Sequence, residues 1–575
     1  MNERLRVMLA TEGTYPFHQG GVSTWCHLFV DLLEPVDFVV YSIMMNPYLT
    51  QKFELRPDTQ LIKVPLWGTE DPSEHLSLPF SEVYLHKRRT DPQIVREHFL
   101  PLFDGLIKEI FSRQKDPHRF GQILQHLYQY FQVYDYRQSF TAEDAWTMFK
   151  RTAISFSESR EQRLAEPSVF DTIQSLGWLY RFLTILNTPV PRVDVAHSAA
   201  AAFCGIPCVL AKLEHNTPFL LTEHGVYLRE QYLSLQQRGY STYLNTFLVR
   251  LIQSVSNLSY AYADQISPVC QFNTRWEQAF GVLSSKTRVI YNGVDEDVFT
   301  VGPPTGPRGQ LTVVSVARVD PVKDIVTLIQ AAAIVLAKLP TVKFVVYGSI
   351  SVPEYHQQCQ QLLQRLGLQS SFILAGHTDD MPAAYQRGDV IALSSITEGF
   401  PYSVVEAMMS GKAVVATDVG GVSEALSDCG ILVRPRQPAE LGEALLRLLQ
   451  DADLRRQLGD AARFRATQYF TVERALSQYW DSYRRLAAQR TRVATVSSEQ
   501  SLLIDRGYAL ASLAHYPAAV DQFRLAIAED PRSPAVPVLL AEIAEAYNQL
   551  GLFDHAFHEL AKAETLIEVM QDIPA

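Results

Sequence analysis

Residues 394–426 read SSITEGFPYSVVEAMMSGKAVVATDVGGVSEAL, and this stretch decides the fold. The apolar run 390–394 predicts a buried strand, and the run 413–416 predicts the next one. Between them Gly399 favours a loop, and the pattern after it favours a helix that begins at Tyr402. Strand, loop, helix and strand in this order are typical of a parallel sheet with right-handed crossovers.

The same rhythm recurs in two series of apolar runs along the chain. The first series is 6–10, 38–41, 194–197, 219–222 and 265–267, and the second is 311–316, 342–347, 372–375, 390–394, 413–416 and 430–433. We therefore expect an α/β protein with two doubly wound, Rossmann-like domains facing a cleft, where such folds bind ligands, by default a nucleotide. The expected boundaries are 1–290 for the first, acceptor-side domain, with an aromatic helical insertion at about 70–175, and 291–480 for the second, nucleotide-sugar-binding domain.

The last part of the chain changes character and predicts an all-α repeat tail over 498–570. Gly507, Tyr516 and Phe523 recur 37 positions later as Ala544, Phe553 and Leu560, a pattern typical of tetratricopeptide-like helix pairs. From Glu499 to Ala575 there are twelve acidic and four basic residues, a net charge of −8. Such a tail predicts a protein partner or self-association through residues 498–570.

Composition excludes several classes of protein. The 575 residues are 47% hydrophobic and carry a net charge of −11, which is typical of a globular chain and disfavours nucleic acid as a partner. The six cysteines form neither a disulfide framework nor a zinc motif. The start lacks a leader's apolar core, and the most apolar window, 195–211, is too short to span a bilayer. We expect a cytoplasmic protein that reaches a membrane only through partners.

Two glutamates carry the chemistry of the opening stretch. Glu398 lies in the loop after a strand, and Glu406 lies eight residues later in the following helix. The backbone N–H groups at Tyr402 and Ser403 would offer a helix N-terminus to a diphosphate. One carboxylate would then lie beside a sugar and the other near ribose hydroxyls. The plain alternative is that Glu398 is a helix cap and Glu406 a solvated helix residue.

This stretch resembles the motif of the retaining family-4 glycosyltransferases of the GT-B fold. In that family two such glutamates precede a G-x-[PA]-V-V-A-[ST]-D-x-G-G-x-x-E run, which here is 411–424. The resemblance implies that Glu398 acts at the sugar, with Gly399 beside it, and that Glu406 binds the nucleotide.

Further positions match the family, and their roles are implied by the resemblance. Arg318 and Lys323 resemble the arginine and lysine that neutralise the donor diphosphate, although Asp324 replaces the glycine usual after that lysine. Gly20 and Gly21 resemble the glycine-rich loop after the first strand, which binds phosphate or sugar. The alternative for the charged pair is an ordinary surface position, and two adjacent glycines alone are weak support.

His224 follows an apolar run where the family places a histidine facing the donor sugar, and His197 is a second candidate at a strand end. Residues 291–295 resemble the N-G-V-D linker that opens the second domain, or are simply a turn. The start EGTYPFHQGGVSTW, together with LTEHGVYLREQYL and VIYNGVD, resembles PelF-type glycosyltransferases of exopolysaccharide synthesis over about residues 5–480. The repeat tail lies outside this resemblance.

The resemblance implies a retaining transfer of a hexose or N-acetylhexosamine from a UDP-sugar to a carbohydrate acceptor, in the cytoplasm beside an inner-membrane polysaccharide-synthesis complex. No cofactor or metal is expected, because Arg318, Lys323 and the helix end would supply the positive charge. Three alternatives stay open: a related sugar-nucleotide epimerase, a phosphorylase with pyridoxal phosphate, and a non-catalytic scaffold that acts through its tail.

Overall fold

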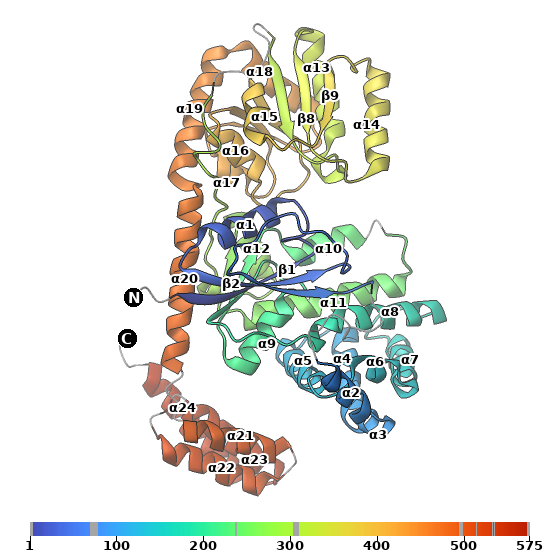
Figure 1. Cartoon of the computed structure of the whole chain (residues 1–575), viewed down its shortest axis with the longest axis vertical. Helices are drawn as coiled ribbons and strands as arrows, with labels where there is room; N and C mark the ends of the chain where they lie inside the picture. The colour runs from blue at the N-terminus through green and yellow to red at the C-terminus, as the bar shows by residue number, and fades with distance from the viewer. Residues whose placement is uncertain are drawn as a thin grey trace. The chain divides into compact units, whose positions relative to one another are not determined.

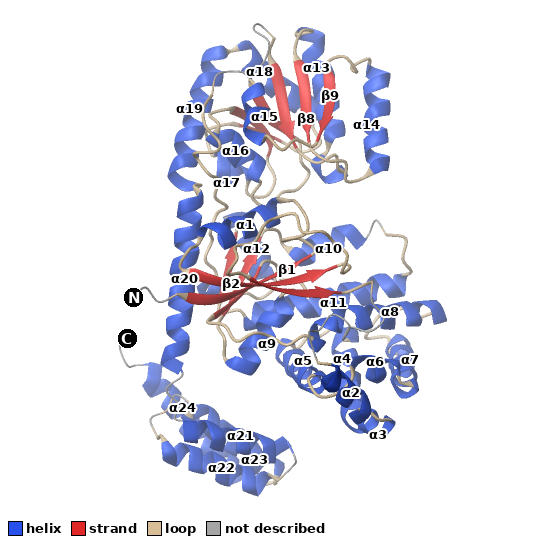
Figure 2. Cartoon of the chain, in the orientation of Figure 1, coloured by secondary structure: helices blue, strands red, loops and turns tan. Residues whose placement is uncertain are grey.

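A computed structural model describes residues 4–68, 79–235, 238–302, 310–493, 498–512, 515–531, 533 and 535–571 (Figure 1). The chain divides into two compact units, Met1–Arg484 and Arg485–Ala575. The first unit contains two parallel six-stranded sheets, and the second unit is helical (Figure 2). The expected α/β class with two Rossmann-like domains is confirmed.

The first sheet has the strand order β3-β2-β1-β4-β5-β6. Its strands are β1 (Leu5–Glu12), β2 (Val36–Met44), β3 (Gln60–Pro65), β4 (Val195–Ser198), β5 (Phe219–Glu223) and β6 (Gln265–Pro268). The strand that sequence reasoning missed is β3, an edge strand whose side chains are partly exposed, so that it lacks a continuous apolar run. Its helices and turns outside the insertion are α1 (Gly21–Leu32), α9 (Gly205–His215), α10 (Tyr227–Leu235), α11 (Thr242–Tyr262), α12 (Gln271–Ala279) and η4 (Ser284–Lys286).

Helices fill the chain between β3 and β4 in the described ranges. They are α2 (Phe80–Arg89), α3 (Pro92–Ile94), η2 (Val95–Phe99), α4 (Leu100–Phe111), α5 (Pro117–Phe131), α6 (Tyr136–Thr141), α7 (Glu143–Glu158), α8 (Val169–Phe182) and η3 (Leu183–Asn187). Their aromatic side chains, such as Phe103 and Phe131, share one core with the first sheet and with α9 and α11. The expected insertion is therefore an integral layer of the first domain. Part of its expected beginning, 70–78, lies outside the described residues.

The second sheet has the order β12-β11-β10-β7-β8-β9. Its strands are β7 (Thr312–Val316), β8 (Lys343–Tyr347), β9 (Phe372–Gly376), β10 (Val390–Leu393), β11 (Ala413–Thr417) and β12 (Ile431–Val433). Its helices and turn are η5 (Pro321–Lys323), α13 (Ile325–Lys338), α14 (Pro353–Leu366), α15 (Met381–Arg387), α16 (Tyr402–Met409), α17 (Val422–Leu426), α18 (Pro438–Gln450) and α19 (Ala452–Tyr469). The next helix, α20 (Val472–Val493), returns to the first sheet. Val313 and Val314 belong to separate hydrophobic cores, because successive strand residues face opposite sides of a sheet.

The second unit holds α21 (Ser498–Ser512), α22 (Tyr516–Glu529), α23 (Val536–Gln549) and α24 (Phe553–Gln571), and each helix packs on the next. Gly507 in α21 meets the ring of Phe523 in α22 so closely that a Cβ would come 2.4 Å from it. The repeat places alanine and leucine at the equivalent positions of the second pair, Ala544 and Leu560. Each helix pair therefore has a small residue, Gly507 or Ala544, in its first helix and a larger one, Phe523 or Leu560, in its second. On α24, Phe553 and Phe557 are 62% and 77% exposed.

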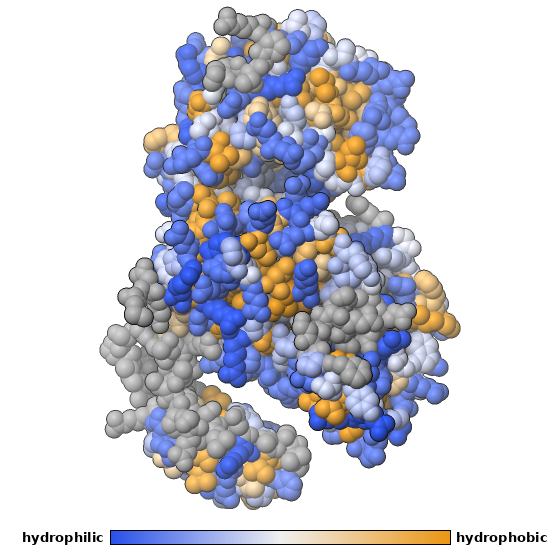
Figure 3. Space-filling model, in the orientation of Figure 1, coloured by the Kyte–Doolittle hydropathy of each residue, from blue (hydrophilic) through white to orange (hydrophobic). Residues whose placement is uncertain are grey.

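Figure 3 shows a face covered largely by hydrophilic residues, with separate hydrophobic areas between them. Within the described ranges, every helix is too short or too polar to cross a membrane.

Candidate active site

The site is centred on the switch point of the second sheet, where the strand order reverses between β7 and β10. Doubly wound sheets bind ligands at the carboxyl ends of the strands at such a point. Lys323 follows β7 and Glu398 follows β10, and Lys323 Nζ lies 2.5 Å from Glu398 Oε1. Ser395 Oγ donates to the same carboxylate oxygen at 2.5 Å. With Lys323 20% exposed and Glu398 10% exposed, the pair is largely shielded from water but open on one side.

The two loops that carry this pair are joined to each other by hydrogen bonds. Ser394 Oγ donates to the Lys323 carbonyl at 2.9 Å, and the Ile396 N–H donates to the Val322 carbonyl at 2.8 Å. Both loops are therefore held in one arrangement before any ligand arrives. This is the preorganisation that electrostatic catalysis requires.

The departure from the family at Asp324 has a structural explanation. Asp324 has φ 47° and ψ 52°, the left-handed conformation that glycine adopts most easily. Aspartate is among the residues that tolerate it. Asp324 also caps α13, because Oδ1 accepts from the Thr327 N–H at 3.3 Å and Oδ2 accepts from Thr327 Oγ1 at 2.7 Å. The replacement thus preserves the backbone turn after Lys323 and adds a helix cap.

Arg318 is exposed in the loop that follows β7, with Nη1 3.5 Å from Ser351 Oγ. Within the described part of the chain it forms no ion pair. Its guanidinium is therefore available to a ligand at the strand ends.

Glu406 is partly buried in α16 and contacts a residue that sequence reasoning missed. Tyr385 Oη donates to Glu406 Oε2 at 2.6 Å, and Tyr385 is itself fully buried in the core of the second domain. Burial raises the pKa of Glu406 to about 7, against the smaller lowering effect of the Tyr385 hydrogen bond. Glu406 is thus an oriented carboxyl group that titrates near neutral pH and differs from a freely solvated helix residue.

The N-terminus of α16 has free donors as expected. Among the described residues, the backbone N–H groups of Tyr402 and Ser403 form no hydrogen bond, since the first turn of a helix leaves them without internal partners. The Tyr402 ring is directed toward the first domain, and Gly21 lies against it: a Cβ on Gly21 would be 3.4 Å from Tyr402 Cδ2. Tyr402 Oη is buried and has no hydrogen-bond partner within the described chain.

The glycines of the first loop lie at the start of α1. Gly20 is the residue before the helix, and Gly21 is its first residue. One turn further along α1, Trp25 packs edge-on against His224, with ring centroids 4.7 Å apart and planes at 76°. The start of α1 therefore contacts both Tyr402 and His224. Trp25 is another residue that sequence reasoning missed.

His224 lies at the junction of the two domains. A Cβ on Gly399 would come 1.9 Å from the His224 carbonyl oxygen, so only glycine fits there. Burial lowers the pKa of His224 to about 3, which keeps the ring neutral. Its Nε2 is buried without a hydrogen-bond partner in the described residues.

His197 is fully buried, and both of its ring nitrogens are engaged. Nδ1 hydrogen-bonds with Tyr483 Oη at 2.6 Å, and Nε2 hydrogen-bonds with Thr222 Oγ1 at 2.8 Å. Thr222 Oγ1 also hydrogen-bonds with Tyr479 Oη at 2.9 Å. Tyr479 and Tyr483 belong to α20, which follows the second sheet in the chain. His197 therefore connects α20 to the first sheet and keeps no ring nitrogen for a ligand.

Two more contacts join the domains beside the site. Arg229 Nη1, on α10, donates to Thr397 Oγ1 at 3.0 Å, directly before Glu398 in the chain. Glu424, the last residue of the matched run, accepts from the backbone N–H groups of Gln271 at 2.7 Å and Phe272 at 2.5 Å. It thereby caps α12 of the first domain. In the described residues, no group of three or more His, Cys, Asp or Glu side chains is arranged to hold a metal ion.

Comparisons with known proteins agree with this architecture. Residues 304–465 match the family model "Glycosyl transferases group 1", and residues 5–285 match "Domain of unknown function (DUF3492)". A D-inositol 3-phosphate glycosyltransferase from Salinispora arenicola is 33% identical over 204 residues, which cover 33% of this chain and 46% of that protein. The chain spans about half the length of the curated relatives that it matches.

Two solved structures resemble the fold. A sucrose-phosphate synthase from Thermosynechococcus elongatus is 17% identical, with a TM-score of 0.56 over 84% of this chain and 100% of that one. HepE of Anabaena, in complex with UDP and glucose, is 16% identical, with a TM-score of 0.52 over 83% of this chain and 99% of that one. The described architecture is the two-domain GT-B fold.

Proposed function

We propose that this chain, a group 1 glycosyltransferase by its second domain, is a retaining enzyme that transfers a hexose or N-acetylhexosamine from a UDP-sugar to a carbohydrate hydroxyl. The observation that carries the proposal is the Lys323–Glu398 pair at the switch point. His224, whose carbonyl lies against Gly399, has a buried Nε2 without a partner among the described residues, and Tyr402 Oη is buried in the same way. This is an arrangement of one cation, one carboxylate and two polar atoms without partners at a junction of domains.

The positive groups would act on the leaving diphosphate. As the bond between C1 of the sugar and the diphosphate oxygen breaks, negative charge grows on that oxygen, and Arg318, Lys323 and the N-terminus of α16 stabilise it. We propose that these groups replace a metal ion in this role. The bond between C1 and the acceptor oxygen forms on the same face, and the acceptor proton passes to the leaving diphosphate.

The two glutamates would contact different parts of the donor. Glu398 is held by Lys323 and Ser395 close to the place of the hexose, and Glu406 would accept hydrogen bonds from ribose hydroxyls with the oxygen that Tyr385 leaves open. A uridine nucleotide is favoured because HepE, which shares the fold, was crystallised with UDP and glucose.

The setting of the reaction is a further part of the proposal. The PelF-like motifs support a cytoplasmic role in exopolysaccharide synthesis, beside an inner-membrane complex. The repeat architecture and net negative charge of 498–570 support a tetratricopeptide-like tail that binds a protein partner or a second copy, with an affinity that weakens as salt rises.

Product analysis tests the proposal. The full chain is incubated with UDP-, GDP- and ADP-sugars and a set of oligosaccharide acceptors, in the presence and absence of EDTA. Mass spectrometry is expected to show a product one hexose or one N-acetylhexosamine heavier with a UDP-sugar, and NMR is expected to show that the anomeric configuration of the donor is retained. Transfer that needs a divalent cation would refute the proposed metal independence, and transfer that inverts the configuration would refute the proposed retention. Release of sugar 1-phosphate from the oligosaccharide, in a parallel incubation with inorganic phosphate in place of the nucleotide sugar, would point to a phosphorylase.

A further inference from the structure

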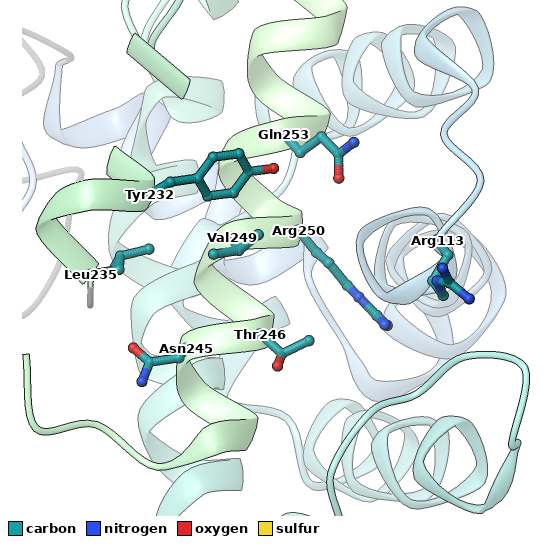
Figure 4. Close-up of a pocket in the computed structure, with 8 residues that line it drawn as sticks. All are labelled: Arg113, Tyr232, Leu235, Asn245, Thr246, Val249, Arg250 and Gln253. Carbon is teal, nitrogen blue, oxygen red and sulfur yellow. The ribbon is translucent and has the colours of Figure 1, made fainter. Parts of the chain in front are cut away.

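A cavity of about 690 Å³ lies in the first domain between α10, α11 and the loop that follows α4 (Figure 4). It is lined by Arg113, Tyr232, Leu235, Asn245, Thr246, Val249, Arg250 and Gln253. Its volume is in the range of small-molecule sites. Figure 4 shows the Arg250 side chain extending from α11 toward Arg113, so that both arginines lie on one side of the cavity.

Arg250 is a buried cation. It is only 6% exposed and donates to the carbonyls of Phe111 and Gln162. Arg113 is exposed, and its Nη1 donates to the Glu161 carbonyl at 3.3 Å. In the described part of the chain, neither arginine forms an ion pair. Because a buried charge is normally paired, two guanidinium groups that contact only carbonyls leave this wall of the cavity positive.

A third basic group, Lys115, lies near this wall. Lys115 Nζ donates to the carbonyls of Glu109 and Ile110, at 3.0 and 2.8 Å, near the C-terminal end of α4. Burial, followed by the charge of Arg250, lowers the pKa of Lys115 to about 7, against a smaller raising effect of the Glu109 carboxylate. That carboxylate is also bound by Arg119, with N and O 3.3 Å apart. The local excess of positive charge contrasts with the chain's net charge of −11.

The other walls suit a sugar. Tyr232 offers an aromatic ring, and Gln253 and Thr246 offer an amide and a hydroxyl. Asn245 offers a second amide, which is oriented by the hydrogen bond that its Nδ2 donates to the Tyr240 carbonyl at 3.2 Å. An aromatic face, amides, a hydroxyl and a positive wall together fit a saccharide that carries an anionic group.

The cavity is connected to the proposed donor site by α10. Arg229 of that helix donates to Thr397, which precedes Glu398. Tyr232, which lines the cavity, comes three residues later, about 4.5 Å further along the helix axis. A ligand in the cavity would therefore be within a few sugar lengths of the reacting centre.

We propose that this cavity binds the anionic group, a carboxylate or a phosphate, of the carbohydrate acceptor. The assignment of the ligand as the acceptor rests on the proposed function. The cavity itself is a binding site for an acidic saccharide whether or not transfer occurs.

Direct binding tests this inference without turnover. The full chain, saturated with UDP, is titrated calorimetrically with two matched pairs: cellobiuronic acid against cellobiose, and glucose 6-phosphate against glucose. The acidic member of at least one pair is expected to bind about tenfold more tightly, as one charge-assisted hydrogen bond allows. The pair with the larger ratio identifies a carboxylate or a phosphate as the group bound.

The variant Arg113→Ala keeps the fold, because this side chain is exposed, and is expected to reduce the ratio to about twofold or less. Arg96→Ala is the matched control, since Arg96 lies in the same insertion but is paired with Asp144 at 3.3 Å. It should leave the ratio unchanged. A wild-type chain with no preference for the acidic sugars, or an Arg113→Ala variant that keeps the preference, would overturn the inference. The role of Arg250 would then be to bind the carbonyl at the end of α4.

UDP affinity and donor hydrolysis are measured on separate portions of the same preparations, to which no UDP has been added beforehand. Acidic saccharide binding that depends on Arg113 in a chain without donor hydrolysis would refute the proposed function and leave the cavity site intact. Donor hydrolysis in a chain that shows no preference for acidic saccharides would refute the cavity site and leave the proposed function intact.

Discussion

Lys323 Nζ lies 2.5 Å from Glu398 Oε1, although the two residues are 75 positions apart in the chain. They meet because β7 and β10 are neighbours in the sheet, so that the loops at their carboxyl ends share the switch point. Ser395 binds the same oxygen from the other side. This ion pair holds a carboxylate at the proposed hexose site and a cation at the proposed diphosphate site in one fixed unit.

Removal of either proposed diphosphate contact should slow turnover far more than it weakens nucleotide binding. In Lys323→Ala and Arg318→Ala we expect kcat to fall about 100- to 1,000-fold, because the charge of the diphosphate grows only as the bond breaks. Affinity for the intact UDP-sugar, measured by calorimetry, should change much less, because its diphosphate has not yet gained that charge. Lys323→Arg serves as the control that keeps a cation beside Glu398. Near-normal turnover in both alanine variants would exclude these residues from the site.

Substitution of the two glutamates should affect UDP binding differently. Glu406→Gln replaces a carboxylate acceptor by a poorer one and should weaken UDP binding. Glu398→Gln should leave UDP affinity nearly unchanged and instead reduce turnover and the discrimination between donor sugars. Calorimetry with UDP, followed by kinetics with several UDP-sugars, measures both effects. Equal losses of UDP affinity in the two variants would contradict this division of roles.

Donor affinity should depend on pH through Glu406. Burial raises the pKa of this group to about 7, so the carboxylate that would accept ribose hydroxyls is lost as the pH falls through that value. Between pH 8 and pH 6 we expect the dissociation constant of UDP-glucose to rise about tenfold. UDP-glucose is preferred to UDP because both of its phosphates are esterified and stay ionised over this range. Glu406→Gln should abolish the dependence, and a wild-type profile that stays flat would refute it.

Position 324 should tolerate glycine better than alanine. Asp324→Gly loses the cap on Thr327 but relieves the left-handed backbone, so the free energy of unfolding should change by less than about 1 kcal/mol. Asp324→Ala loses the same cap and keeps the backbone strain, which should cost about 2 kcal/mol. Denaturant unfolding of both variants measures the difference. An alanine variant as stable as the glycine variant would show that the conformation at 324 is not a constraint.

A stable fold with donor binding and hydrolysis should require α20 but not the helices that follow it. A chain that ends after Arg492 keeps Tyr479 and Tyr483, which bind the first sheet through Thr222 and His197, and should keep UDP affinity and donor hydrolysis. A chain that ends after Thr471 loses both contacts and should unfold at a lower temperature. Sedimentation should show that the first truncation changes the oligomeric state or abolishes binding to a partner. An unchanged state, with the same partners and activity, would show that the tail is passive.

Local pattern alone was sufficient for most of the fold. Buried parallel strands are continuous apolar runs, and the runs expected for both sheets match the observed strands within two residues at each end, except that β2 continues three residues beyond the run 38–41. A further exception is β3, where an edge position allows polar and partly exposed side chains. The spacing of Glu398 and Glu406, and the positions of Arg318 and Lys323 relative to a strand, were likewise local features that a single sequence shows.

Contacts between distant segments were decided only by the tertiary structure. The sequence contains His197 and Tyr483 but has no periodicity that relates residues 286 positions apart, so the loss of both histidine nitrogens to hydrogen bonds could not be foreseen. The hydrogen bond from Tyr385 to Glu406, and the position of Arg113 and Arg250 beside one cavity, likewise depend on contacts between separate segments. By itself the sequence determined which segments are strands and helices, because hydrophobic periodicity is local. Which polar groups meet at the strand ends was determined by the order in which those strands pair, and that order exists only in the folded chain.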